Sequence, residues 1–246
     1  RNLVPPHPVY PFEENQLRDF GKGKPTVREA LKWCAEKFKV YEEPLPIEPL
    51  ERFERALKSE RELDIGDYLE ENSLIADALR FGFQTLKGEI LEGETSTGEK
   101  LNRVKIENVV EVPQKAPNNG YINFKIIASE KEKNVKIGVA VIQPPKSVLS
   151  GLNRLTEYQK FDITRGCFLR SKSKKIDKKG GAYKLLEHLV SNLGGEWVDL
   201  KAEEIKPLVD IYSVYQKRDS YKLSEEEILE FSKSITLNNN LLREIL

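Results

Sequence analysis

Basic residues concentrate in one stretch of the chain, between Arg165 and Lys184. This stretch holds eight basic residues and a single acidic residue, Asp177. The candidates for ligand contact within it are Arg165, Arg170, Lys172, Lys174, Lys175, Lys178 and Lys179. Serines and glycines separate them, and nucleic-acid phosphates are contacted by cationic side chains, hydroxyls and backbone amides of this kind. The spacing predicts a surface that binds DNA or RNA, with a solvated lysine loop as the alternative.

The charge of this stretch stands out against the rest of the chain. Forty basic and forty acidic residues cancel over the 246 residues. Eight basic residues minus one acidic residue give the stretch +7, so the remaining residues sum to −7. A basic segment on a mildly acidic body indicates a local binding face rather than a general attraction to anions.

A second group of candidate residues lies in two predicted β-strands, at 121–128 and 135–143. Both runs are rich in alternating and β-branched apolar residues, and a polar turn joins them, which predicts a hairpin. Asn123 lies in the first strand, and Val141 and Gln143 lie in the second. Carboxylates and a lysine at such positions could hold Mg²⁺ and activate water, but these three side chains are neutral.

The order helix, three strands, helix, strand over about residues 64–200 resembles the restriction-endonuclease-like, PD-(D/E)xK, core. In that family an Asp and a Glu-x-Lys motif form the metal site. The matching positions here are Asn123 and Val141-Ile142-Gln143. The resemblance therefore implies a nuclease-like domain that has lost its metal site and binds no metal.

Two other interpretations stay open. The first is an active Mg²⁺-dependent nuclease with displaced carboxylates, for which the candidates are Glu70, Glu71, Glu107 and Glu130. The second is a protein-interaction domain that regulates an ATPase and contacts no nucleic acid. No catalytic site is evident in the chain, so whether it is an enzyme is left open.

The segment Pro11–Leu31 resembles the lid of AAA+ or origin-recognition-type ATPases. It combines a Pro-Phe start, a short helix, a glycine turn and an arginine early in the next helix. By this resemblance Arg28 would be the sensor arginine that reaches a γ-phosphate, a role that suits the planar guanidinium. The resemblance implies an upstream ATPase domain that binds ATP and Mg²⁺. An ordinary helix with a solvated arginine, capped by Thr26 and Glu29, is the alternative.

Apolar periodicity and turn residues indicate the elements that carry these groups. Prolines predict an extended arm at 1–11 and a linker at 41–49. Helices are predicted at 12–20, 26–38, 67–86, 147–160, 183–193, 202–217 and 225–235, with another beginning at Pro49. Further strands are predicted at 89–91, 104–112, 163–170 and 196–200. Ser224 and Glu227 form a second predicted capping box.

The predicted fold class is α/β, a small mixed sheet flanked by helices in a restriction-endonuclease-like arrangement. We expect a helical lid-like segment at 1–43, the α/β domain at 44–200, and a helical, winged-helix-like tail at 201–246. The absence of methionine suggests a piece of a longer protein.

Composition favours a cytoplasmic protein. The two cysteines, Cys34 and Cys167, lie far apart and indicate a reducing compartment. No apolar run approaches the roughly 20 residues of a membrane span. The pairing of an ATPase lid with a nuclease-like domain suggests a role in defence against mobile elements.

Overall fold

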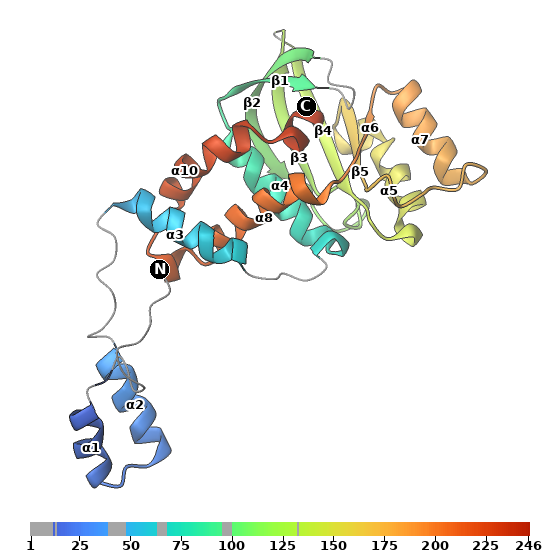
Figure 1. The fold of residues 1–246 in the computed structure, drawn as a ribbon. Helices are drawn as coiled ribbons and strands as arrows, with labels where there is room; N and C mark the ends of the chain where they lie inside the picture. The colour runs from blue at the N-terminus through green and yellow to red at the C-terminus, as the bar shows by residue number, and fades with distance from the viewer. Residues whose placement is uncertain (1–11, 13, 39–47, 63–67, 95–99, 132) are drawn as a thin grey trace. The chain divides into compact units, whose positions relative to one another are not determined.

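The structure is a computed structural model that describes residues 12, 14–38, 48–62, 68–94, 100–131 and 133–246. The chain forms two compact units, Arg1–Glu48 and Pro49–Leu246 (Figure 1). The arm predicted at 1–11 lies outside the described residues, as does nearly all of the linker predicted at 41–49. None of the helices described is long and apolar enough to cross a bilayer.

The first unit is a pair of helices, α1 (Glu14–Lys22) and α2 (Val27–Phe38). Trp33 of α2 stacks on Phe20 of α1 with 4.8 Å between ring centroids. The start of α2 is capped reciprocally. Thr26 N–H donates to Glu29 Oε2 at 2.8 Å, and Glu29 N–H donates to Thr26 Oγ1 at 3.3 Å. The predicted capping box is confirmed.

The second unit is built on one mixed sheet. Its strands are β1 (Ile90–Glu94), β2 (Lys100–Glu111), β3 (Phe124–Glu130), β4 (Lys133–Val141), β5 (Arg165–Leu169) and β6 (Glu196–Val198). They follow one another in sequence order across the sheet. Strands β1 to β4 pair antiparallel, and β4, β5 and β6 pair parallel. The mixed α/β class is confirmed, and so is the predicted hairpin, although its strands are displaced: β3 begins at Phe124 and β4 ends at Val141, so Asn123 and Gln143 lie just outside them.

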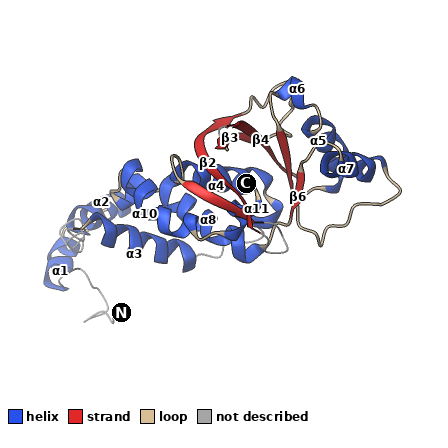
Figure 2. Cartoon of the chain, turned by 90° about the horizontal axis from the view of Figure 1, so that it is seen from above, coloured by secondary structure: helices blue, strands red, loops and turns tan. Residues whose placement is uncertain are grey.

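Helices cover both faces of this sheet (Figure 2). The longer ones are α3 (Pro49–Glu62), α4 (Asn72–Thr85), α5 (Val148–Leu155), α7 (Gly181–Ser191), α8 (Ala202–Gln216) and α10 (Glu225–Leu237). The short ones are α6 (Tyr158–Phe161), α9 (Arg218–Tyr221), α11 (Asn240–Glu244) and the 3₁₀ turns η2 (Tyr68–Glu70) and η3 (Pro145–Ser147). Strand residues alternate between the two faces. Val139 and Val141 therefore pack in one core with α4 and α8, while Ala140 and Ile142 pack in the other with α5 and α7.

Two predicted helices are shorter than expected. The helix predicted at 147–160 is split into α5 and α6, and at the break the Thr156 hydroxyl donates to the Leu152 carbonyl at 3.0 Å. A hydroxyl that binds a helical carbonyl in this way favours an end or a bend. The helix predicted to begin at Asp67 begins at Asn72, after η2.

The C-terminal helices belong to the same compact unit as the sheet. Tyr212 of α8 contacts Phe81 of α4 with 6.0 Å between ring centroids. The capping box of Ser224 and Glu227 at the start of α10 is confirmed. Residue 201 is thus not a boundary between compact units, although every helix or strand after it is a helix.

Candidate functional site

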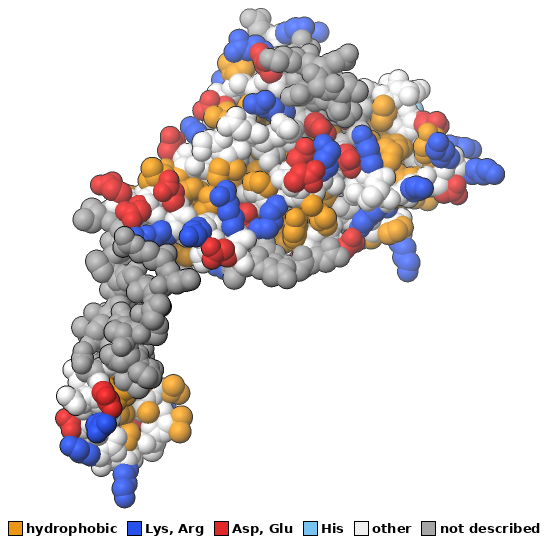
Figure 3. Space-filling model, viewed as in Figure 1, with side chains coloured by type: hydrophobic (Ala, Val, Ile, Leu, Met, Phe, Trp, Pro, Cys, Tyr) orange, Lys and Arg blue, Asp and Glu red, His pale blue; other side chains and the backbone are white. Residues whose placement is uncertain are grey.

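The lysine loop, residues 171–180, connects β5 to α7. It leaves the carboxyl end of a parallel strand, which is where open α/β sheets commonly bind ligands. The side chains of Lys172, Lys175, Lys178 and Lys179 are exposed, whereas Lys174 is partly buried and forms an ion pair with Glu70 at 2.5 Å. Figure 3 shows Lys and Arg side chains gathered at this edge of the second unit. The structure thus places four of the predicted lysines on one exposed loop.

Arg170, the residue before the loop, lies inside the fold with 1% of its surface exposed. Its Nη1 donates to the carbonyls of Ile142 and Gln143 at 2.8 and 2.5 Å, and its Nε donates to the carbonyl of Lys174 at 3.0 Å. Burial lowers the pKa of this guanidinium. The predicted phosphate contact is therefore corrected for Arg170, which instead fixes the first turn of the lysine loop to the end of β4.

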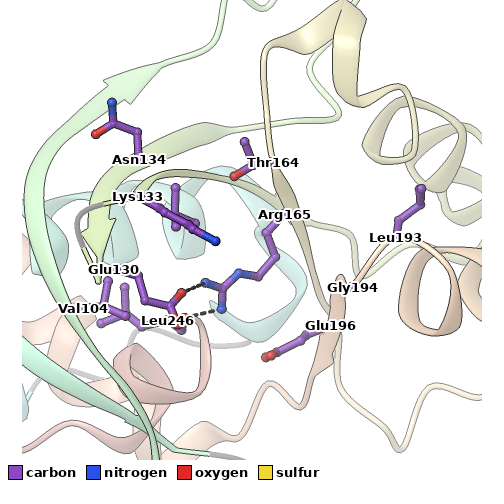
Figure 4. A pocket seen from close by; sticks show the side chains of 11 residues that line it. Val104, Glu130, Lys133, Asn134, Thr164, Arg165, Leu193, Gly194, Glu196 and Leu246 are labelled. Carbon is purple, nitrogen blue, oxygen red and sulfur yellow. Dashed lines mark hydrogen bonds and ion pairs between the residues drawn. The ribbon is translucent and has the colours of Figure 1, made fainter.

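Arg165 lies at the opposite end of β5, in a cavity of about 510 Å³. Its guanidinium points toward Glu130 and Leu246 (Figure 4), donating to Glu130 Oε2 at 3.4 Å and to the Leu246 carbonyl at 2.5 Å. Burial raises the pKa of the nearby Glu196 carboxyl, and Arg165 opposes that rise. Arg165 is thus engaged within the fold at the amino end of β5, and it is not part of the lysine loop.

The three positions that match the nuclease motif come together at the strand ends. Asn123 Oδ1 accepts a hydrogen bond from Val141 N–H at 2.8 Å. Gln143 is fully buried, and its Oε1 accepts from Ser171 N–H at 3.3 Å. The backbone N–H of Gln143 donates to Asn72 Oδ1 at 3.0 Å. These amide side chains therefore bind backbone groups and join β3, β4, α4 and the lysine loop.

The candidate carboxylates are divided between two places. Glu70 pairs with Lys174 beyond the carboxyl end of β5, and Glu71 follows in sequence. Glu130 pairs with Arg165 at the amino end of β5. Hydrogen bonds from Lys105 and Ser129 lower the pKa of Glu107. The four glutamates do not form one site, and no cluster of three or more potential metal ligands occurs among residues the structure describes.

Arg28 lies in the first unit, exposed in the first turn of α2. No hydrogen bond or ion pair joins its side chain to another of the described residues. Its predicted role as a nucleotide sensor is neither supported nor opposed by contacts within this unit.

Asn72 is the site residue that sequence analysis missed. It is the first residue of α4, and its side chain binds the Gln143 backbone across 71 positions of sequence. An asparagine at a helix start is a common local signal. That signal does not reveal a partner on a distant strand.

Comparisons with known proteins assign no family to this chain. No protein-family model, curated protein or solved structure matches it.

Proposed function

We propose that the second unit is a restriction-endonuclease-like domain without a metal site, and that it binds the phosphate backbone of DNA or RNA through the lysine loop. The observation that carries this proposal is the exposure of Lys172, Lys175, Lys178 and Lys179 on a loop whose base Arg170 holds. A loop that is held at its base loses less conformational entropy when it binds.

The order of elements supports the nuclease-like assignment. Helix α4 precedes the antiparallel strands β1 to β4, one strand more than the three expected, and α5 and α6 then lead to β5, which is parallel to β4. Asn123 and Val141, the positions that would hold the first two metal ligands, are hydrogen-bonded neighbours. This order is compatible with the family's, and amide and apolar side chains occupy the positions where its acidic ligands would lie.

The remaining parts of the proposal rest on the resemblance of the first unit to an ATPase lid. Arg28 would contact the γ-phosphate of ATP bound with Mg²⁺ by an upstream ATPase domain. The protein would then act in the cytoplasm, in defence against mobile elements, with the second unit binding nucleic acid.

The salt dependence of binding tests the proposal. Fluorescence anisotropy with labelled duplex DNA, single-stranded DNA and RNA measures the affinity of the full chain. Neutralising about four phosphates predicts that affinity for duplex falls about a hundredfold between about 50 and about 200 mM salt. An affinity that does not change with salt contradicts the proposal.

Charge reversal locates the binding surface. Lys172, Lys175, Lys178 and Lys179 are changed to Glu in one variant, and the exposed Lys58, Lys87, Lys131 and Lys133 are changed to Glu in a matched control. Both variants change the net charge equally. Loss of binding in the first alone supports the lysine loop, whereas equal binding by the two variants indicates a solvated loop.

The two alternatives make different predictions. A nuclease with displaced carboxylates would cleave plasmid DNA with Mg²⁺ or Mn²⁺ and stop on chelation. The proposal predicts no cleavage, because Asn123, Val141 and Gln143 provide no acidic ligand. A protein-interaction domain would show neither cleavage nor binding of any of the three nucleic acids.

A further inference from the structure

A second cavity, of about 390 Å³, opens beside the loop that joins β2 to β3. Its walls are the end of β2, the following loop to Asn118, Lys125 of β3, and residues 160–162 of α6 and the turn after it. No lining residue belongs to the lysine loop. The volume lies within the range typical of sites for small organic ligands.

The lining of this cavity has an apolar part that could cover a flat ring. Its apolar members are Val110, Val112, Pro113, Ala116, Pro117 and Phe161. Val110 is 37% exposed, whereas Phe161 is largely buried. A ligand ring that covered Val110 would remove apolar surface from water.

Three lysines provide positive charge at the same cavity. Lys125 Nζ donates to the Phe161 carbonyl at 3.3 Å, so its ammonium is held at the wall. Lys160 pairs with Glu157 at 3.0 Å. The ammonium of Lys115 has no hydrogen bond or ion pair with any residue that the structure describes.

The two acidic residues of the lining are already paired with cations outside it. Glu111 binds Arg80, and Asp162 binds Lys136 at 2.7 Å and also pairs with Lys125 of the lining at 3.5 Å. Asp162 is thus shared by Lys136 and Lys125, and Lys160 is paired with Glu157, which leaves Lys115 as the lining lysine without an ion pair among the described residues. The cavity therefore has an excess of positive charge over its apolar surface.

The loop that forms one wall is fixed by a buried side chain. Asn118 is 2% exposed, and its Nδ2 donates to the carbonyls of Ile122 and Pro113 at 2.8 and 3.1 Å. Its Oδ1 accepts from Ile122 N–H at 2.8 Å. The cavity is thereby formed before a ligand binds, which reduces the free-energy cost of binding.

We propose that this cavity binds a compact organic anion with a planar apolar body. The ring lies against Val110, Pro117 and Phe161, and the carboxylate or phosphate accepts hydrogen bonds from Lys115 and Lys160. This inference does not depend on nucleic-acid binding by the lysine loop, because the two places share no residue.

Isothermal titration calorimetry of the full chain tests the site with 1-naphthoate, its neutral analogue 1-naphthalenemethanol, and adenosine monophosphate. We expect 1-naphthoate to bind about tenfold or more tightly than the neutral analogue, since a hydrogen bond to a charged group contributes that much. Binding of the nucleotide as well would indicate a nucleotide-type ligand. Binding of 1-naphthoate alone would indicate a simple aromatic acid.

Paired variants assign the binding to this cavity. Lys115→Gln with Lys160→Gln should weaken 1-naphthoate binding about tenfold or more, whereas Lys131→Gln with Lys133→Gln should leave it unchanged. The Glu variant of the lysine loop should also bind 1-naphthoate normally, even if it no longer binds nucleic acid. Equal affinity for the neutral analogue, no binding of either anion, or an unaffected Lys115/Lys160 variant would overturn the proposal.

Discussion

A buried arginine connects the lysine loop to the sheet. Removing a guanidinium from water costs free energy unless hydrogen bonds replace its hydration. Arg170 obtains these bonds from the carbonyls of Ile142, Gln143 and Lys174, and it is 1% exposed. The same bonds determine where the exposed lysines begin. In the proposed function, Arg170 would thus position the lysines without touching the nucleic acid itself.

Replacing Arg170 should destabilise the fold and weaken binding together. Arg170→Met removes the donors to three buried or partly buried carbonyls. We expect the free energy of unfolding to fall by about 3–5 kcal/mol, because unsatisfied buried groups cost about 1–3 kcal/mol each. Urea unfolding measures this change. Lys172→Met, at an exposed position, should change it by less than about 0.5 kcal/mol.

Arg170→Lys separates charge from geometry. One ammonium retains the charge but lacks the planar fork of the guanidinium, so it should recover only part of the lost stability. Nucleic-acid affinity is measured under conditions in which both variants are folded. It should decrease with the stability of the loop and should not depend only on whether the charge is kept. A stable Arg170→Met variant would show that the three hydrogen bonds do not anchor the loop.

Charge patterning in the sequence identified the lysine loop but not that Arg165 and Arg170, the two arginines of the same basic stretch, are engaged within the fold. Eight basic residues in one stretch could be counted directly. The positions of Arg165 and Arg170 depend on Glu130, Leu246, Ile142 and Gln143, which come from other parts of the chain. No local pattern distinguishes a cation that faces solvent from one that binds distant carbonyls.

At the scale of elements, sequence patterns predicted the structure correctly where all the groups involved lie close together in the chain. The capping box of Thr26 and Glu29 uses groups three positions apart, so the sequence alone could predict it. The hairpin of β3 and β4 was predictable from alternation and its polar turn. The split between α5 and α6 was not, because the apolar period of Val148, Leu152 and Leu155 does not reveal that the Thr156 hydroxyl binds a helical carbonyl.

The cap on α2 should make the stability of that helix depend on pH. Hydrogen bonds from the backbone and side chain of Thr26 lower the pKa of Glu29. Because the folded-state pKa is lowered, the cap stabilises α2 fully at pH values above the ordinary glutamate pKa of about 4.3. This stabilisation is lost as pH falls through the lower, folded-state pKa.

A carboxyl ¹³C NMR titration of the full chain measures this effect. The midpoint for Glu29 should lie below the midpoint measured for the same residue in urea. Thr26→Ala, which keeps the backbone donor but removes the hydroxyl, should raise the folded-state midpoint part of the way. Identical midpoints in the folded and unfolded chain would show that the capping box does not form in solution.

At the scale of the whole molecule, the C-terminal helices are part of the core. Ile205, Leu208, Val209, Ile211 and Val214 of α8 are each 0% exposed and join the cluster on the α4 face of the sheet. The sequence shows where the strands end and the helices begin, near residue 201. It does not show that these helices fill the space beside α4, because their partners lie more than a hundred positions earlier.

Truncation tests the boundary of the second unit at Pro49 and the predicted domain boundary near residue 201. A chain of residues 49–246 should unfold cooperatively with little loss of stability, because it retains both cores of the second unit. A chain of residues 1–200 should lack a cooperative transition in differential scanning calorimetry. Losing even one large buried side chain costs about 2–5 kcal/mol, and α8 alone contributes several, against a total stability of about 5–15 kcal/mol. Cooperative unfolding of 1–200 would instead favour an independent helical tail, and failure of 49–246 to fold would show that the second unit needs residues before Pro49.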